Sequence, residues 1–99
     1  MRRNVIIEKL QRGETVAFRE GGQSMTPIIK SKELTTVGPV DPKDVKVGDI
    51  VLAKVNGTVY LHKVTAIKGG RYQISNNHNH VNGWCGPNHI YGRLLRVDP

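Results

Sequence analysis

The chain begins with apolar residues spaced three and four positions apart, which is the spacing of one face of an α-helix. Within residues 2–12, the apolar residues Ile6, Ile7 and Leu10 lie at this spacing, together with Arg3. Gly13 follows directly and is a typical helix stop. The remaining positions are mostly basic or polar. We therefore predict a short basic helix, residues 1–13, with a solvated outer face.

After Gly13 the pattern changes to short β-rich segments that are separated by turn residues. Asn56-Gly57 and Lys68-Gly69-Gly70-Arg71 lie between such segments and predict two tight hairpins. The predicted strands cover residues 14–18, one or two segments within 28–40, and residues 49–55, 58–64 and about 89–97. Closely spaced strands with one short helix indicate a mainly β fold, a small antiparallel β domain over residues 14–99.

The Asn56-Gly57 hairpin also predicts which side chains share a face of the sheet. A two-residue loop pairs Val55 with Thr58 and therefore places Val51 opposite His62. Because side chains alternate along a strand, one face carries Val51, Ala53, Tyr60, His62 and Val64. A histidine on such an apolar face is either a satisfied core residue or a functional residue with a partner elsewhere in the chain.

The net charge of the chain indicates anionic binding partners but does not identify which kind. The 99 residues carry a formal net charge of +7, which favours contact with nucleic acid, anionic lipid or acidic partners. The basic residues are spread along the chain and do not alternate with the few aromatic residues, as they do in base-stacking modules. A solvated basic surface is therefore expected for most of these charges, with nucleic acid as a further partner class.

Cysteine usage and hydropathy address the compartment. The single cysteine, Cys85, excludes an internal disulfide and fits a reducing cytoplasm. No apolar segment approaches the roughly 20 residues that span a bilayer. The first apolar residues are interrupted at Glu8-Lys9, too early for the core of a signal peptide. We expect a cytoplasmic protein without a membrane span.

Candidate chemistry comes from three short motifs in a fixed order. They are Gly22-Gln23-Ser24-Met25-Thr26-Pro27, Val47-Gly48-Asp49-Ile50-Val51 and Leu61-His62-Lys63-Val64. Over about residues 15–97, the chain resembles the superfamily of type I signal peptidases and LexA-like self-cleaving repressors, with their G-x-S-M-x-P nucleophile motif. The resemblance implies the β fold of these proteins. It also implies a small serine endopeptidase that cleaves a peptide or protein substrate and needs no cofactor.

The resemblance further implies roles for individual residues. Ser24 would be the nucleophile and His62 the general base, as in histidine-type members, with Lys63 as a flanking residue that the hairpin register turns to the opposite face. The residue types suit this chemistry, because a serine hydroxyl needs a base to take its proton and histidine titrates near neutral pH. Around Ser24, the oxyanion and substrate-binding segment would comprise Gly22, Gln23 and Met25.

One part of the superfamily pattern is changed. Histidine-type members carry aspartates in a later segment, where this chain has Asn77 and then Asn82 or Gly83. We expect Asn82 to help by orienting the imidazole of His62, although an amide does not stabilise an imidazolium as a carboxylate does. The alternative function is therefore a catalytically weak or inactive member of the fold that binds protein or nucleic acid.

A second group of polar side chains competes with this site. Imidazole and thiolate are good zinc ligands, and the group comprises His78, His80, Cys85 and His89. Their intervals match no common zinc motif. The sequence therefore favours the serine–histidine pair and no metal, with this cluster as the competing hypothesis.

Overall fold

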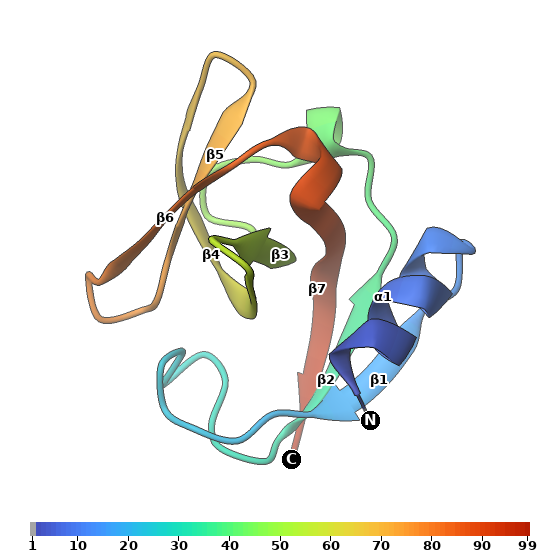
Figure 1. The fold of residues 1–99 in the computed structure, drawn as a ribbon. Coiled ribbons are helices and arrows are strands. Elements are labelled where there is room, and N and C mark those ends of the chain that lie inside the picture. The colour runs from blue at the N-terminus through green and yellow to red at the C-terminus, as the bar shows by residue number, and fades with distance from the viewer. Residues whose placement is uncertain (1) are drawn as a thin grey trace.

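The computed structural model describes residues 2–99 and shows a strongly curved β-sheet with one helix against it (Figure 1). The helix α1 (Arg3–Gln11) comes first, and two 3-10 helices, η1 (Pro42–Asp44) and η2 (Pro87–His89), connect strands. The strands are β1 (Val16–Arg19), β2 (Leu34–Gly38), β3 (Ile50–Val55), β4 (Thr58–Lys68), β5 (Arg71–Ser75), β6 (Val81–Cys85) and β7 (Ile90–Asp98). The predicted fold class, a mainly antiparallel β fold with a short N-terminal helix, is confirmed.

The seven strands found within residues 2–99 form one antiparallel sheet in the order β1-β2-β7-β3-β4-β5-β6. Buried side chains form two clusters, one containing Leu52 and the other containing its neighbours Val51 and Ala53. Because neighbouring residues of a strand point to opposite faces, β3 is buried on both sides. A buried cluster thus lies on each face of β3. Strand β4 pairs with β3 along the whole length of β3.

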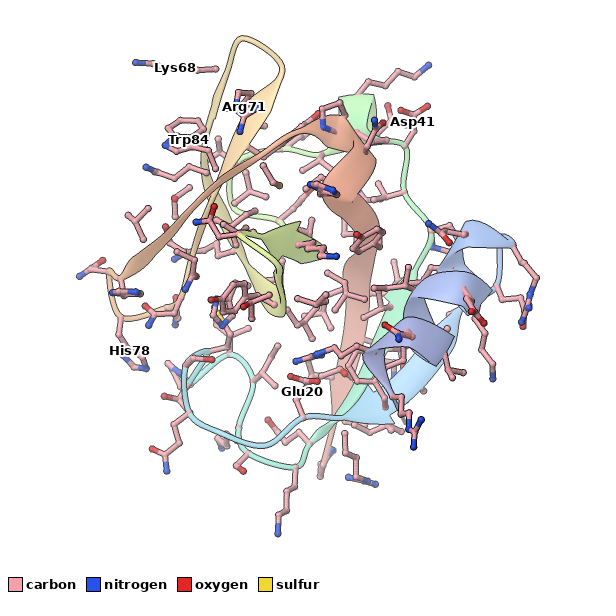
Figure 2. The ribbon with its side chains drawn as sticks, in the orientation of Figure 1. Glu20, Asp41, Lys68, Arg71, His78 and Trp84 are labelled. Carbon is pink, nitrogen blue, oxygen red and sulfur yellow. The ribbon has the colours of Figure 1, made fainter. Side chains whose placement is uncertain are left out.

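The β3–β4 hairpin has the predicted register. The paired residues are Val51 with His62, Ala53 with Tyr60, and Val55 with Thr58. Asn56 and Gly57 both have positive φ, 49° and 83°, as a type I′ turn requires. The second predicted hairpin is also confirmed, with β4 ending at Lys68 and β5 beginning at Arg71. That turn lies at one end of β5, and the β5–β6 loop with His78 lies at the other (Figure 2).

Helix α1 is close to its predicted extent. Its buried residues are Ile6 and Leu10, at the predicted spacing, and it packs against β1 and β7. This packing brings Arg3, in the first turn, next to Glu20 at the end of β1. Within the described residues, no helix is long and apolar enough to cross a membrane.

The segment before β2 differs from the prediction. Ile28 and Ile29 do not belong to a strand, and only residues 34–38 of the predicted 28–40 segment form one. The Ile29 amide donates to the carbonyl oxygen of Met25 at 2.9 Å, which closes a turn of the backbone. Ile29 is nevertheless buried in the core. Ile29 is therefore apolar because it is a buried loop residue, and not because it belongs to a strand.

Strand β6 lies outside the predicted strands because its residues do not alternate in polarity. Its Gly83 has a φ of 141°, and a β-carbon there would lie 2.9 Å from Cγ1 of Val55. The missing side chain lets β6 cross close to the β3–β4 hairpin. Residues 81–85 are thereby positioned by the fold and not by their own strand propensity.

Gly92 of β7 lies where a side chain has no room. A β-carbon there would be 2.8 Å from both the carbonyl oxygen of Gly38 and Cγ1 of Val37. We predict that Gly92→Ala lowers the free energy of unfolding by about 1–3 kcal/mol through overpacking, measured from urea-induced unfolding. Gly86→Ala is the matched control, because a β-carbon at Gly86 would meet nothing within 4 Å and its φ is −86°. Equal stability losses in the two variants would contradict this packing argument.

Candidate active site

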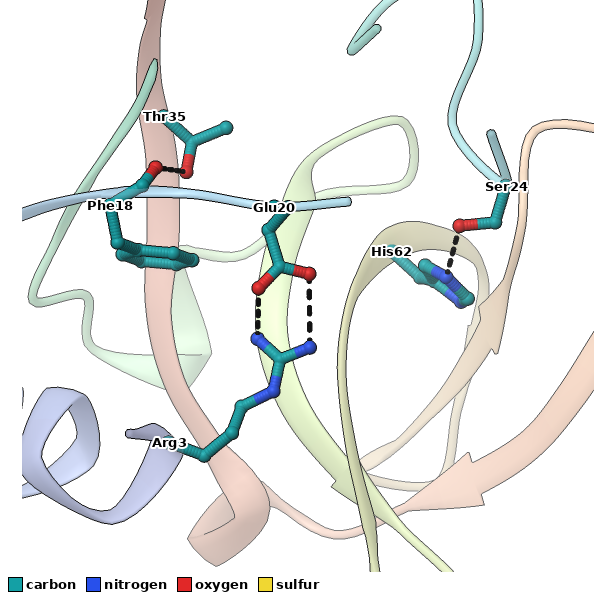
Figure 3. A network of polar contacts seen from close by, with 6 residues as sticks. All are labelled: Arg3, Phe18, Glu20, Ser24, Thr35 and His62. Carbon is teal, nitrogen blue, oxygen red and sulfur yellow. Dashed lines mark hydrogen bonds and ion pairs between the residues drawn. The ribbon is translucent and has the colours of Figure 1, made fainter. Parts of the chain in front are cut away.

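Ser24 and His62 lie far apart in the sequence and meet in the fold. Ser24 belongs to the loop of residues 20–33 between β1 and β2, and His62 belongs to β4. Ser24 Oγ lies 3.0 Å from His62 Nε2 (Figure 3). The loop reverses near Gly22, whose φ of 95° is a conformation that favours glycine. The hydroxyl is thereby directed at the ring edge of a histidine that the hairpin register holds in place.

The second ring nitrogen of His62 is also hydrogen-bonded. Nδ1 lies 2.7 Å from Oδ1 of Asn82 on β6. Because a carboxamide oxygen only accepts, Nδ1 carries the proton and donates it to this bond. In a neutral imidazole, Nε2 is then free of hydrogen and accepts from the Ser24 hydroxyl. The ring of Tyr60 stacks on His62 with centroids 4.8 Å apart and fixes its plane.

Burial lowers the pKa of His62 below its ordinary value of 6.5, because the protein interior solvates an imidazolium poorly. The hydrogen bond with Asn82 and the negative charge of Glu20 raise this pKa, and the positive charge of Arg3 lowers it. His62 is only 8% exposed. Burial dominates, so the ring is neutral at neutral pH and can accept a proton.

The asparagine-rich loop between β5 and β6 holds the Ser24 segment in place. The Asn77 amide donates to the carbonyl oxygen of Ser24 at 2.8 Å. The Asn77 side-chain amide donates to the carbonyl oxygen of Thr26 at 2.9 Å, and Oδ1 accepts from Lys63 Nζ at 3.0 Å. Asn77 therefore joins the serine loop to β4 through contacts that are separate from the Ser24–His62 hydrogen bond.

His78 makes a further contact with the same loop. Its Nε2 lies 3.0 Å from the carbonyl oxygen of Gln23 and 3.0 Å from Thr26 Oγ1. Since a carbonyl oxygen only accepts, Nε2 of His78 donates to Gln23. The Gln23 carbonyl also accepts from Thr26 Oγ1 at 2.9 Å. These contacts fix the peptide plane between Gln23 and Ser24, and with it the direction of the Ser24 amide.

A pocket of about 360 Å³ opens beside the Ser24–His62 pair. Its apolar lining comes from Met25, Ile29, Val59, Tyr60 and Leu61. Arg3 and Glu20 also line it and form a two-pronged ion pair with N–O distances of 2.5 and 2.9 Å, drawn in Figure 3. The ion pair ties helix α1 to the start of the serine loop, and the pocket combines an apolar wall with the Ser24 hydroxyl.

The three residues expected around Ser24 have different environments. Met25 is buried in the core and Gly22 lines the pocket, where its amide donates to Ser31 Oγ at 3.2 Å. Gln23 has an exposed side chain that does not line the pocket, and its carbonyl oxygen makes the contacts. Any role of Gln23 in the site therefore belongs to its backbone.

Sequence reasoning missed several residues of this site. Arg3 and Glu20 are 17 positions apart, and neither belongs to a motif. His78 enters through the fold of the β5–β6 loop. Spacing along the chain carries no signal for such contacts, although the arginine in the apolar stripe of the helix marks an amphipathic position that faces the protein.

The structure does not bring the residues of the competing zinc cluster together. Cys85 is buried in β6, where it pairs with Tyr72, and His89 ends η2. His78 and His80 lie in the β5–β6 loop at the other end of β6. Among residues 2–99, no three histidine, cysteine, aspartate or glutamate residues come together in a way that could hold a metal ion.

Comparison with known families agrees with the sequence motifs. A sequence model of the family described as Peptidase S24-like matches residues 3–94. No curated protein matches the chain. The match covers α1, the serine loop and most of β7, and it confirms the resemblance to LexA-like and signal peptidase proteins at the level of family and fold.

Proposed function

The chain belongs to the Peptidase S24-like family, and on that premise we propose that it is a serine endopeptidase in which Ser24 is the nucleophile and His62 its general base. The observation that carries the proposal is the 3.0 Å distance between Ser24 Oγ and His62 Nε2. This distance suits direct proton transfer between a nucleophile and its base. The neutral state of His62 supports the same direction of transfer.

In the proposed acylation step, Nε2 of His62 takes the hydroxyl proton while Ser24 Oγ attacks the carbonyl carbon of the scissile peptide. The resulting imidazolium donates this proton to the leaving amine, and the C–N bond breaks to give an acyl-enzyme. Water then attacks the ester with His62 again acting as base, which restores Ser24 and releases the new carboxylate. Asn82 keeps Nδ1 protonated and Nε2 free throughout these steps.

The Ser24 amide is our candidate for stabilising the tetrahedral oxyanion. Among the described residues, none is hydrogen-bonded to this amide, so it is available to a substrate. Its direction is set by the Gln23 carbonyl, which lies on the other side of the same rigid peptide plane. A pre-oriented donor of this kind contributes roughly 3–4 kcal/mol to transition-state stabilisation.

The substrate class follows from the lining of the pocket. An extended peptide with an apolar side chain fits the surface formed by Met25, Ile29 and Leu61 beside Ser24. A bulky charged side chain would have to lie beside the Arg3–Glu20 ion pair, where both carboxylate oxygens are already bonded. We therefore expect cleavage next to an apolar residue.

Asn82→Asp tests the proposal through the pH profile. A carboxylate next to Nδ1 stabilises the imidazolium, so it raises the pKa of His62 and strengthens the base. We predict a rise of about tenfold in kcat/KM at high pH, since a charge-assisted hydrogen bond is stronger by roughly 1–1.5 kcal/mol. The acid limb of the profile moves to higher pH. Both changes are measured as peptide hydrolysis over a pH series.

Asn4→Asp is the control for added charge, because Asn4 is exposed on α1 and outside the pocket. Its profile should overlay that of the wild type. An acid limb that stays in place in Asn82→Asp would mean that His62 is not the group whose titration controls the rate.

Asn77→Ala tests the positioning of the serine loop. The substitution removes the side-chain contacts to Thr26 and Lys63 but leaves the backbone bond to Ser24. We predict that kcat falls roughly 10- to 100-fold, because small displacements of a nucleophile are costly, while KM changes little. Asn77→Asp keeps the acceptor for Lys63 and should recover part of the loss. An unchanged kcat in Asn77→Ala would show that the loop is positioned without this side chain.

One observation favours a second function, a family member that binds peptide without cleaving it. The partner of His62 is the neutral Asn82 and not a carboxylate, so the imidazolium formed during catalysis lacks a counter-charge. For this alternative, wild type and Ser24→Ala would retain the same peptides, and mass spectrometry would find them intact after prolonged incubation with either protein.

A further inference from the structure

A second pocket, of about 470 Å³, lies on the other side of the β3–β4 turn. We call it the Trp84 pocket, and its lining comprises Lys54, Asn56, Gly57, Arg71, Trp84, Cys85, Gly86, Pro87, Asn88 and His89. It shares no lining residue with the pocket beside Ser24. The two pockets are therefore separate, although both adjoin the same hairpin.

The charge of the Trp84 pocket has one sign. Its charged lining residues are Lys54 and Arg71, and no aspartate or glutamate among the described residues lines it. The positive lining agrees with the excess of basic residues in the whole chain, whose net charge is +7. A concave surface whose charged groups are all cationic concentrates anions and favours an anionic ligand over a neutral one.

The Trp84 pocket also presents an aromatic surface. Trp84 is 36% exposed, which leaves part of its large ring open to a ligand. It pairs with Gln73 across β5 and β6, and Arg71 lies two residues before Gln73 on the same face of the sheet. Figure 2 shows Arg71 and Trp84 next to each other, with Lys68 beyond them. The fold thus places the aromatic side chain of Trp84 near basic side chains from other parts of the sequence.

The backbone around the Trp84 pocket leaves room for a ligand. A β-carbon at Gly57 or Gly86 would meet nothing within 4 Å. At Gly83, by contrast, a β-carbon would lie 2.9 Å from Cγ1 of Val55, so β6 packs directly against the β3–β4 hairpin there. The arrangement is a preformed cavity with open glycines at its edge.

From this arrangement we propose that the Trp84 pocket binds a segment of single-stranded nucleic acid, with a base stacked on Trp84 and the adjoining phosphates at Lys54 and Arg71. Single-stranded segments offer the π-face and the negative charge that these side chains match together. A carboxylate-rich peptide would use the cations but leave the indole without a partner. In a duplex the base faces are covered by neighbouring pairs and cannot reach it. The proposal is independent of peptide hydrolysis at Ser24.

The test uses the intrinsic fluorescence of Trp84, the one tryptophan of the chain. A short oligothymidylate is titrated into the protein at several salt concentrations. We expect quenching that saturates, with log K falling by roughly 0.7 per decade of salt for each phosphate that is contacted. Ser24→Ala should bind the oligothymidylate as tightly as the wild type does. The binding test is therefore independent of the peptidase proposal.

Variants locate the binding site. Arg71→Ala should weaken binding and reduce the salt slope, whereas Lys30→Ala, an exposed lysine in the serine loop, should change neither. For Trp84→Ala, binding is followed by anisotropy of a labelled strand, and loss of stacking should weaken it roughly 5- to 100-fold. Far-ultraviolet circular dichroism confirms that each variant is folded.

Three outcomes would overturn the proposal. The first is an absence of quenching. The second is an equal loss of affinity in Lys30→Ala and Arg71→Ala, which would indicate diffuse attraction to a basic surface. The third is equal quenching by poly-glutamate or by the corresponding duplex, which would assign the Trp84 pocket to acidic protein or to double-stranded nucleic acid. Inorganic phosphate should compete with the strand without quenching.

Discussion

Ser24→Ala is expected to lose peptide hydrolysis, with kcat/KM falling at least about 10³-fold. The methyl group cannot form the acyl-enzyme, and removal of the nucleophile in well-studied serine peptidases costs several orders of magnitude. The fold should survive, because Ser24 is exposed and its hydroxyl contacts only His62 among the described residues. Cleavage is followed by mass spectrometry of a diverse peptide mixture that contains apolar residues, so that any bond the protein cuts is identified from its products.

Lys30→Ala is the control for changes within the same loop, because its exposed side chain makes no contact with Ser24 or His62. It should cleave the same peptides at the wild-type rate. Persistent cleavage by Ser24→Ala at bonds that the wild type also cuts would remove Ser24 from the mechanism.

His62→Ala is expected to reduce kcat/KM by a comparable factor, because the serine hydroxyl then has no base within reach. In the wild type the base must be neutral, so the rate rises with pH as His62 loses its proton and falls as pH drops through its pKa. Burial lowers that pKa below the ordinary value. Activity should therefore persist to a more acidic pH than an exposed histidine would allow, and the profile of kcat/KM against pH measures it.

The control is His89→Ala, since His89 is exposed at the end of η2 and does not line the pocket beside Ser24. It should keep both the rate and the overall shape of the profile. If His62→Ala retained wild-type activity, Lys63 would become the candidate base. The hairpin register opposes that assignment, since Lys63 pairs with Ile50 and its amine donates to Asn77.

Local chemistry made much of the fold predictable. Asn56-Gly57 specifies a tight turn, and the turn fixes every pairing of β3 with β4, including Val51 with His62. Residues 81–85 could not be recognised as a strand, because their pairing depends on Gly83 approaching Val55. Likewise, Ile29 is apolar because the loop inserts it into the core, which a strand pattern does not distinguish.

Part of the candidate site could be predicted from the sequence, because some of its residues belong to short motifs. The family resemblance named Ser24, His62 and Asn82. The structure places His62 within hydrogen-bond distance of both Ser24 and Asn82, while their catalytic roles stay predictions. The supporting contacts were inaccessible. Arg3 meets Glu20 only because α1 packs against the sheet, and Arg71 comes near Trp84 only when β5 and β6 pair.

The most direct test is the reactivity of Ser24 toward a fluorophosphonate, read as the mass of the intact protein and located by peptide mapping. We predict one adduct, on Ser24, formed at a rate that rises with pH through the titration of His62. We also predict that His62→Ala reacts at least about 10²-fold more slowly. No adduct on Ser24, or equal labelling of the wild type and His62→Ala, would contradict activation of this serine by this histidine.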